Sequence, residues 1–294
     1  MSSAPLAAVP AKQGPAGPAM SVVSGTTTLY AHLGDPIDIV KSPFIYNPWF
    51  RLRGIDAAVI PMGLRSVDFV PAIATLRAIT NLHGLIVTMP HKIAIVPLLD
   101  SRSDAVEAAG SCNAVVRRPD GTLHGELFDG LGFVAGLVRR GFAVRATRCL
   151  VVGAGGVGSA IAAALAAGGA AEIVIHDTSA DAAGRLASRL DSHYPGTRTL
   201  VGGNDAAGHD LVVNASPLGM HETDPLPVDV RRLAPATFVG EVVMKTAMTP
   251  LLEAAAKRGC RYQIGLDMLY EQIPLYLQLF GYGRPSPDEL RAIG

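Results

Sequence analysis

Short apolar runs alternate with amphipathic stretches along the chain from residue 26 onward. In the first part, the apolar runs predict strands over residues 28–33, 57–61, 84–88 and 113–117. The stretches between them carry apolar positions at helical spacing and predict helices over residues 43–51, 66–81 and 91–98. Strands that alternate with helices in this way are typical of an α/β domain with a sheet of its own.

A second alternating unit follows a connecting helix, which is predicted over residues 131–140 and ends at Gly141. Strands are predicted over residues 148–152, 172–176, 199–202, 211–214 and 239–243, and helices over residues 161–167, 180–192 and 249–258. Regular alternation of this kind predicts a doubly wound parallel sheet covered by helices on both faces. An amphipathic stretch over residues 268–279 is expected to pack back on the first unit.

The turn after the first strand of this second unit is rich in glycine. Residues 151–160 (VVGAGGVGSA) open an alanine-rich helix, and Asp177 ends the next apolar run. In a dinucleotide-binding βαβ unit, Gly153 allows the tight turn, Gly155 admits the pyrophosphate, and Gly158 lets helix and strand pack closely. The residues predicted to bind the dinucleotide here are Gly153, Ala154, Gly155, Gly156, Val157, Gly158 and Asp177.

Two other interpretations apply to the same segment. Residues 149–171 carry no charge. An uncharged segment of this length could span a membrane. Many glycines, a natural division into strand, turn and helix, and the lack of a second hydrophobic span argue against it. A buried βαβ unit whose glycines serve only packing remains an alternative.

Asp177 also bears on the choice between NAD and NADP. An acidic side chain at the end of the second strand accepts hydrogen bonds from the adenosine ribose and repels a 2′-phosphate. No arginine follows until Arg185. We therefore expect NAD to be preferred over NADP.

These patterns divide the chain into parts with different expected roles. Residues 1–24, rich in Ala, Pro, Ser and Gly, are expected to form a disordered tail. Residues 25–130 are expected to form a substrate-binding and catalytic domain, with residues 265–294 packing back on it. Residues 131–264 are expected to form the dinucleotide-binding domain, so that cofactor and substrate meet in a cleft between the two.

Composition narrows the range of partners. The 25 basic and 25 acidic residues of the 294-residue chain cancel, and no basic stripe is present, so we expect no nucleic-acid or membrane partner. The cysteines, at positions 112, 149 and 260, and the histidines lack metal-ligand spacing, which predicts no metal site and buried reduced thiols in a cytoplasmic protein. Monomer and homodimer both remain open.

Two charged residues stand where chemistry is expected. Lys92 lies just past a predicted strand, after a proline-containing turn, and Asp129 lies where the chain passes into the second unit. An arbitrary lysine or aspartate is about as often a solvated surface charge as a functional group. A catalytic role for Lys92 and Asp129 is favoured because both lie within a series of sequence motifs.

A series of motifs occurs in one order along residues 28–280. They are residues 34–43 (GDPIDIVKSP), 87–92 (VTMPHK), 110–113 (GSCN), 129–133 (DGLGF), 214–220 (NASPLGM) and 265–272 (GLDMLYEQ). Together they resemble the shikimate dehydrogenase family. The resemblance implies a catalytic pair in Lys92 and Asp129, and ring hydroxyls held by Asn113 and Gln272.

The chemistry agrees with the resemblance. Hydride transfer from a secondary alcohol requires the hydroxyl proton to leave, so a proton-transfer group must lie within hydrogen-bond reach, and Lys92 is the candidate. Whether Asp129 orients the lysine or shares the proton stays open. On the nicotinamide side, cofactor contacts are expected from Asn214, Ser216 and Gly265.

The departures from the family pattern gather around one substrate group. In the family, serines, a threonine and a tyrosine surround the substrate carboxylate, and here only Ser42 and Thr88 are kept. Apolar side chains stand where polar ones are expected, at Val40, Ile86, Phe128 and Met244. Ordinary drift could produce such changes, but altered substrate specificity is favoured, with His91 or Lys245 as possible compensating donors.

The sequence therefore predicts an NAD-dependent oxidoreductase that transfers a hydride between NAD and a secondary alcohol on an alicyclic ring similar to shikimate or quinate. One alternative is a true shikimate or quinate dehydrogenase with an unusual carboxylate site. Another is a non-catalytic NAD-binding sensor, although a sensor has no need of a proton-transfer group.

Overall fold

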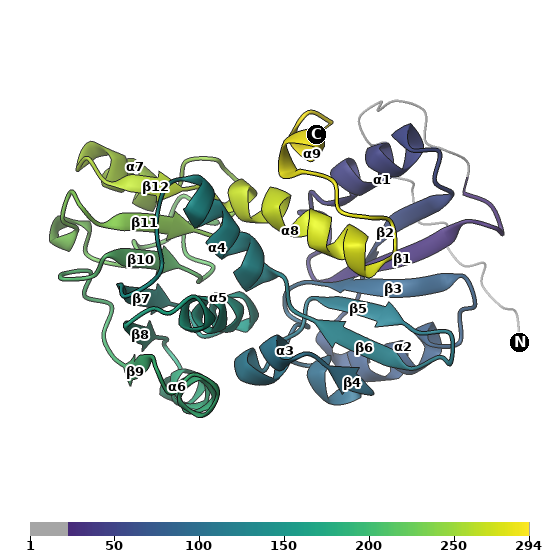
Figure 1. Ribbon diagram of the computed structural model, residues 1–294, viewed down its shortest axis with the longest axis horizontal. Coiled ribbons are helices and arrows are strands. Elements are labelled where there is room, and N and C mark those ends of the chain that lie inside the picture. The colour runs from purple at the N-terminus through teal and green to yellow at the C-terminus, as the bar shows by residue number, and fades with distance from the viewer. Residues whose placement is uncertain (1–22, 294) are drawn as a thin grey trace, which may run out of the picture.

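The computed structural model describes residues 23–293, and within them the chain forms two six-stranded sheets (Figure 1). The tail expected over residues 1–24 lies outside the described residues, apart from Val23 and Ser24. The two sheets occupy opposite ends of the molecule, with helices α4 (Asp129–Arg139) and α8 (Gly265–Leu279) between them. The predicted α/β class is confirmed.

The first sheet has the strand order β2-β1-β3-β5-β6-β4. Its strands are β1 (Thr28–Gly34), β2 (Ala57–Gly63), β3 (Leu82–Val87), β4 (Ser101–Arg102), β5 (Ala114–Arg117) and β6 (Leu123–Glu126). Strands β1, β2 and β3 run parallel, whereas β5 is antiparallel to both β3 and β6. The short strands β4 and β6 were not predicted, because neither has an apolar run long enough to show period-2 alternation.

Helices α1 (Pro43–Leu52), α2 (Phe69–Leu76) and α3 (Asp104–Ala109) belong to this part of the chain. The predicted helix over 91–98 is wrong: it is a series of turns that ends in a 3₁₀ turn at Val96–Leu98. The carbonyl of Lys92 accepts a hydrogen bond from the amide of Cys112 at 2.8 Å instead of from a following helical turn. A partner distant in sequence therefore replaces the local helical bond.

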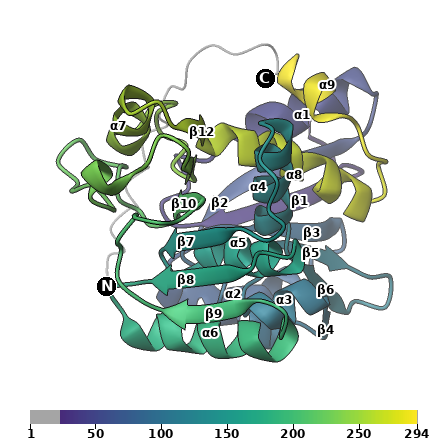
Figure 2. The ribbon, with the colours of Figure 1, turned by 60° about the vertical axis from the view of Figure 1, so that its left-hand side comes forward.

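The second sheet is parallel throughout, with the order β12-β11-β10-β7-β8-β9. Its strands are β7 (Arg148–Val152), β8 (Glu172–His176), β9 (Arg198–Val201), β10 (Leu211–Asn214), β11 (Phe238–Glu241) and β12 (Arg261–Gln263). Helices α5 (Gly156–Ala167), α6 (Ala180–His193) and α7 (Pro250–Lys257) follow its strands, and Figure 2 shows α6 beside β9. The strand order reverses between β7 and β10, which is where such sheets bind their ligands.

Strand β7 shows why both faces of this sheet are apolar. Cys149 and Val151 pack into one hydrophobic core, whereas Leu150 and Val152 pack into another on the opposite face, against α7. Because side chains alternate across a strand and both faces are covered, the strand is a continuous apolar run rather than an alternating one.

Helices α4, α5 and α8 approach one another closely at glycines. A Cβ at Gly130 would lie 2.0 Å from the carbonyl oxygen of Ala160 in α5, and one at Gly132 would lie 2.7 Å from that of Met268 in α8. Only glycine permits contacts this short between helix backbones. The linking helix therefore has a fixed position against both neighbours.

Helix α8 returns to the first sheet. Its residues Leu269, Ile273 and Tyr276 share a core with Tyr30 of β1 and Ile45 of α1. The short helix α9 (Pro287–Arg291) follows it and adds Leu290 to the same core.

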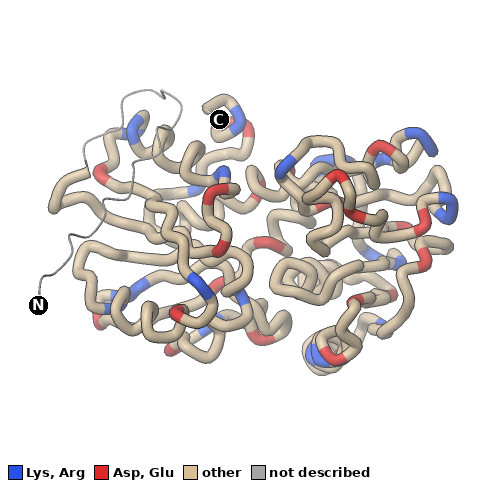
Figure 3. The backbone as a smooth tube through the Cα atoms, turned by 180° about the vertical axis from the view of Figure 1, so that it is seen from behind, with Lys and Arg blue, Asp and Glu red and all other residues tan. Residues whose placement is uncertain are grey.

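Acidic and basic positions are interspersed over both halves of the described chain (Figure 3). Among residues 23–293, no helix combines the length and apolar character needed to cross a membrane.

Candidate active site

Lys92 and Asp129 form a buried ion pair between the two halves of the chain. The Nζ atom of Lys92 donates to Oδ2 of Asp129 at 2.5 Å, and the two side chains are only 9% and 3% exposed. Asp129 is the first residue of α4, where the partial positive charge of the helix N-terminus stabilises a carboxylate. The pair predicted from sequence is therefore in contact.

The stem of Lys92 lies against the glycine-rich turn of the second sheet. A Cβ at Gly156, the first residue of α5, would lie 2.7 Å from the Cβ of Lys92. The hydroxyl of Ser111 donates to the carbonyl of Gly156 at 2.9 Å. These contacts hold the lysine at the point where the two sheets meet.

Asn113 and Gln272 lie together near this pair. Nδ2 of Asn113 donates to Oε1 of Gln272 at 3.3 Å, and Oδ1 of Asn113 accepts from the amide of Phe128 at 2.8 Å. Both side chains are buried, and Nε2 of Gln272 makes no hydrogen bond with a described residue. Thr88, half-buried at the end of β3, likewise has a hydroxyl without a partner among the described residues.

The glycine-rich turn fits a dinucleotide. Gly153 has φ +112°, and a Cβ there would lie 2.6 Å from the carbonyl of Ala215, whereas a Cβ at Gly155 would meet nothing within 4 Å. A Cβ at Gly158 would lie 1.9 Å from the carbonyl of Gly153. The backbone is thus open at Gly155 and closed at its neighbours, beside the free amides of α5. Val157 is half-buried in the first turn of the same helix.

Asp177 is joined to this turn. Its Oδ2 accepts from the amide of Ala154 at 2.7 Å, and its Oδ1 accepts from the amide of Ser179 at 2.8 Å. The carboxylate therefore lies at the end of β8 beside the predicted phosphate loop, which is where an adenosine ribose is bound in such folds. Among residues 23–293, no cluster of His, Cys, Asp and Glu could hold a metal ion.

The loop after β10 is braced by a carboxylate that the sequence did not single out. Glu241, fully buried at the end of β11, accepts from Asn214 at 3.0 Å and from the Thr249 hydroxyl at 2.9 Å. It also accepts from the amide of Val242 at 2.8 Å, and burial raises its pKa. An acidic residue at the end of an apolar strand was the available signal.

Asn214 and Ser216 lie in this braced loop. Oδ1 of Asn214 accepts from the Ser216 hydroxyl at 2.6 Å, and its Nδ2 donates to Glu241 and to the carbonyl of Leu218. Both polar atoms of the Asn214 side chain make hydrogen bonds to this loop and to Glu241, so the side chain stabilises the conformation of the loop. Gly265, at the start of α8, abuts the adjoining loop, because a Cβ there would lie 2.3 Å from the carbonyl of Val243.

The four apolar residues expected around the substrate differ in burial and in the residues they pack against. Ile86 and Phe128 are buried in the core between the first sheet and α8, and the Phe128 ring meets Tyr276 edge-on at 5.0 Å. Met244 is half-buried and packs against that core, whereas Val40 is half-buried outside it. Ser42 is buried, and its hydroxyl lies 2.8 Å from Nδ1 of His32, a residue that the sequence analysis missed.

His91 does not compensate for the missing donors. Its Nε2 lies 2.6 Å from the carbonyl of Leu64, and its ring stacks on Phe69 with centroids 4.2 Å apart. It is a core residue, so the suggestion that it binds substrate is wrong. Lys245 is exposed and makes no hydrogen bond or ion pair with a described residue.

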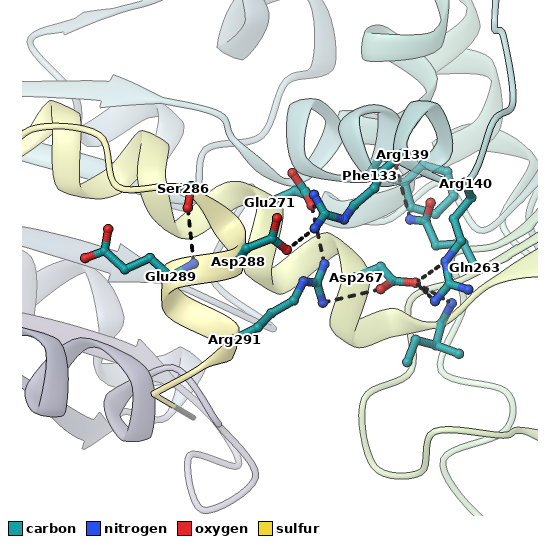
Figure 4. Close-up of polar contacts among 11 residues, drawn as sticks. Phe133, Arg139, Arg140, Gln263, Asp267, Glu271, Ser286, Asp288, Glu289 and Arg291 are labelled. Atoms are coloured by element: carbon teal, nitrogen blue, oxygen red, sulfur yellow. Dashed lines mark hydrogen bonds and ion pairs between the residues drawn. The ribbon is translucent and has the colours of Figure 1, made fainter.

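An ion-pair network fixes the helices that carry the site (Figure 4). Arg140, just past α4, donates to Asp267 of α8 at 2.8 Å, and Arg291 of α9 reaches Asp267 at 3.5 Å and Glu271 at 3.3 Å. Arg139 pairs with Asp288. These contacts fix α4, which begins at Asp129, against α8, which carries Gln272.

A buried lysine–carboxylate pair beside a glycine-rich turn that fits a dinucleotide is the arrangement expected of an oxidoreductase that uses NAD or NADP to act on a secondary alcohol. The chain belongs to the shikimate dehydrogenase family: residues 33–115 match the model of the shikimate dehydrogenase substrate binding domain. A shikimate dehydrogenase (NADP(+)) of Geobacter sulfurreducens is 34% identical over 92% of this chain and 96% of its own. The resemblance inferred from the motifs is confirmed.

Solved structures agree with this assignment. Shikimate 5-dehydrogenase from Listeria monocytogenes, in complex with shikimate and NAD, has a TM-score of 0.83 and 27% identity over 93% of this chain and 98% of its own. Quinate dehydrogenase from Corynebacterium glutamicum, in complex with NAD, has a TM-score of 0.82 and 26% identity over 91% of this chain and 98% of its own.

Proposed function

We propose that this protein is an NAD-dependent dehydrogenase that oxidises a secondary alcohol on an alicyclic ring, or reduces the corresponding ketone, and that shikimate itself is a poor substrate. The observation that carries the proposal is the buried Lys92–Asp129 pair against Gly156 of the dinucleotide turn. We further propose that residues 25–130 with 265–294 bind the substrate, and that residues 131–264 bind the dinucleotide.

The residues around the pair have distinct roles in this proposal. The dinucleotide, when bound, supplies the hydride acceptor or donor. Lys92 is the proton-transfer group: its ammonium form gives a proton to the carbonyl oxygen during reduction, and its neutral amine form takes the hydroxyl proton during oxidation. Such a group must lie within hydrogen-bond reach of that oxygen. Asp129 holds Nζ of Lys92 in place, and Asn113 and Gln272 orient the ring through its other hydroxyls.

NAD is the proposed cofactor. The Asp177 carboxylate beside Ala154 would accept hydrogen bonds from ribose hydroxyls and repel a 2′-phosphate. Support also comes from the quinate dehydrogenase and the shikimate 5-dehydrogenase crystallised with NAD, although the Geobacter relative carries NADP(+) in its name.

The substrate proposal depends on donors that are missing. Val40, Ile86, Phe128 and Met244 stand where the family resemblance implies polar groups around a carboxylate. Each lost hydrogen bond to a charged group costs about 1.5–3 kcal/mol. The strong similarity to shikimate dehydrogenases over most of the chain favours a second candidate, a shikimate or quinate dehydrogenase with a different carboxylate site.

The proposal is tested by following NAD and NADP reduction with a panel of cyclic alcohols and hydroxy acids that includes shikimate and quinate. Turnover of an alicyclic alcohol with NAD supports it, and a micromolar KM for shikimate would replace it with the second candidate. Binding of NAD without turnover of any member would favour a sensor instead.

A further inference from the structure

His32 is a buried polar residue on a strand whose other side chains are mostly apolar. It lies on β1, where Tyr30 and His32 share the face toward α1 and α8, while Ala31 and Leu33 pack into the opposite core. Its neighbour across the strand pair is Ile86 of β3. His32 therefore lies beside one of the positions where a donor to the substrate was expected and is missing.

The imidazole has one partner and one free nitrogen. Its Nδ1 lies 2.8 Å from the hydroxyl of Ser42, just before α1, and Ser42 does not use that hydroxyl to cap the helix. Nε2 of His32 makes no hydrogen bond with a described residue. This nitrogen is not completely buried, and the residue as a whole is 5% exposed. Nε2 of His32 is therefore available to bond a ligand.

The imidazole is neutral. Burial, followed by the positive charge of Lys92, lowers the pKa of His32 to about 3. That effect also places His32 within electrostatic range of the proposed proton-transfer group.

A neutral His32–Ser42 pair has the same hydrogen-bonding capacity in either tautomer. If the Ser42 hydroxyl donates to Nδ1, then Nε2 is a donor and the Ser42 oxygen is an acceptor. If Nδ1 donates to Ser42, then Nε2 is an acceptor and the Ser42 hydroxyl is a donor. In both arrangements the pair offers a ligand one donor and one acceptor.

We infer that His32 and Ser42 together select a substrate with an uncharged hydroxyl group at the ring position where the family resemblance implies a carboxylate. A hydroxyl both donates and accepts, so it satisfies both members of the pair, whereas a carboxylate only accepts and leaves one member unsatisfied. The buried Ile86, which pairs with His32 across the two strands, further disfavours a charge. The inference rests on the proposed function and names the class of its substrate: cyclic polyols and their ketones without a carboxylate.

The decisive comparison uses two compounds that differ in that one group. They are shikimate and the alcohol made by reducing its carboxylate to a hydroxymethyl group. The wild-type protein should give at least a tenfold higher kcat/KM for the alcohol. His32→Leu should lower kcat/KM for the alcohol roughly 2- to 10-fold, mostly through KM, because one neutral hydrogen bond is lost.

A second measurement does not depend on turnover. In the dead-end mixture of protein, NADH and the hydroxymethyl alcohol, the imidazole ¹⁵N signals of His32 should shift, and they are assigned by their loss in His32→Gln. Thermal unfolding and NAD affinity of both variants identify any general damage. Unchanged His32 signals at saturating alcohol would overturn the inference.

Lys41 provides the counter-test, because it is the cation nearest in sequence to Ser42, is half-buried and makes no ion pair with a described residue. Lys41→Gln should leave the ratio of kcat/KM values for the two compounds unchanged. A wild-type preference for shikimate that is lost in Lys41→Gln would overturn the inference while leaving the dehydrogenase proposal intact. Failure to turn over either compound or any member of the wider panel would overturn both.

Discussion

Lys92 and Gly156 are in such close contact that no side chain fits at the glycine beside the stem of the lysine. A Cβ at Gly156 would lie 2.7 Å from Cβ and 3.1 Å from Cδ of Lys92. Lys92 follows β3 of the first sheet and Gly156 follows β7 of the second. The position of the proposed proton-transfer group therefore depends on how the glycine-rich turn packs against it.

Gly156→Ala should therefore lower turnover. The added methyl group must displace the Lys92 stem. A displacement of about 1 Å in a reacting group can cost about 10²-fold in rate. Overpacking should also lower the free energy of unfolding by about 1–3 kcal/mol. Steady-state kinetics and urea unfolding measure the two effects.

Gly155→Ala is the matched control, because a Cβ there meets nothing within 4 Å. Its stability should stay near that of the wild type, while its affinity for NAD should fall, since the methyl group would fill the space proposed for the pyrophosphate. If Gly155→Ala and Gly156→Ala lowered kcat equally, the proposed displacement of Lys92 by a Cβ at Gly156 would be contradicted.

Lys92→Ala should reduce kcat by about 10²–10⁴-fold with little change in NAD affinity, because it removes the proton-transfer group and leaves the dinucleotide turn in place. Asp129→Asn should act in the same direction. Fluorescence titration with NADH and steady-state kinetics give the two quantities, and near-normal turnover in both variants would move the chemistry to other residues.

The same variants should also differ in stability. Lys92→Ala leaves the carboxylate of Asp129 buried without its cation, and removing one partner of a buried pair costs about 3–5 kcal/mol. The double variant Lys92→Ala with Asp129→Asn removes the stranded charge and should be more stable than Lys92→Ala alone. A double variant less stable than Lys92→Ala would show that the pair's charges do not govern stability.

Asp177→Ala should weaken NAD binding and narrow the difference in affinity between NAD and NADP, because the carboxylate proposed to bind the ribose is lost. Asp177→Asn keeps an oxygen for the amide of Ala154 but removes the charge, so it isolates the repulsion of the 2′-phosphate. Tighter binding of NADP than of NAD by the unaltered protein, measured by calorimetry, would show that the NAD assignment is wrong.

His32 makes stability depend on pH. Its pKa falls from 6.5 to about 3 in the folded protein, so between these values the unfolded chain binds a proton at His32 that the folded protein does not bind. The contribution of the neutral imidazole is complete above pH 6.5 and is lost as the pH falls toward 3, with a slope of up to about 1.4 kcal/mol per pH unit. Urea unfolding between pH 7 and pH 4.5 should show a shallower slope for His32→Gln, and parallel slopes would contradict this assignment.

Restoring donors should improve the use of shikimate. Val40→Ser with Met244→Tyr and Phe128→Thr should raise kcat/KM for shikimate, each recovered bond to the carboxylate contributing about 1.5–3 kcal/mol. Phe128 packs on Tyr276, so its replacement leaves a cavity, and Val40→Ser with Met244→Tyr is the safer variant. No gain in kcat/KM by a folded variant would show that these positions do not bind the carboxylate.

Local patterns were enough to predict much of the fold. The apolar runs at β7 and β8 and the glycines between β7 and α5 depend on neighbours in the chain, because strand alternation, turn geometry and helix starts are short-range properties. The position of Asp177 at the end of β8 is likewise a local property, and its contact with the amide of Ala154 joins it to the turn. The helix predicted over residues 91–98 did not form, because the carbonyl of Lys92 accepts a hydrogen bond from the distant Cys112 instead of from the next helical turn.

The contacts between distant residues were decided by the tertiary structure. The family resemblance paired Lys92 with Asp129. The close contact of Lys92 with Gly156, the His32–Ser42 pair and the burial of His91 on Phe69 instead follow from how the two sheets and α8 pack. A histidine has the same local signature whether its ring stacks in a core or faces a ligand. The sequence by itself determined the class of fold, the dinucleotide turn and the candidate pair. The tertiary structure decided which side chains lie close together in the site, because only long-range packing sets the distances between residues far apart in the chain.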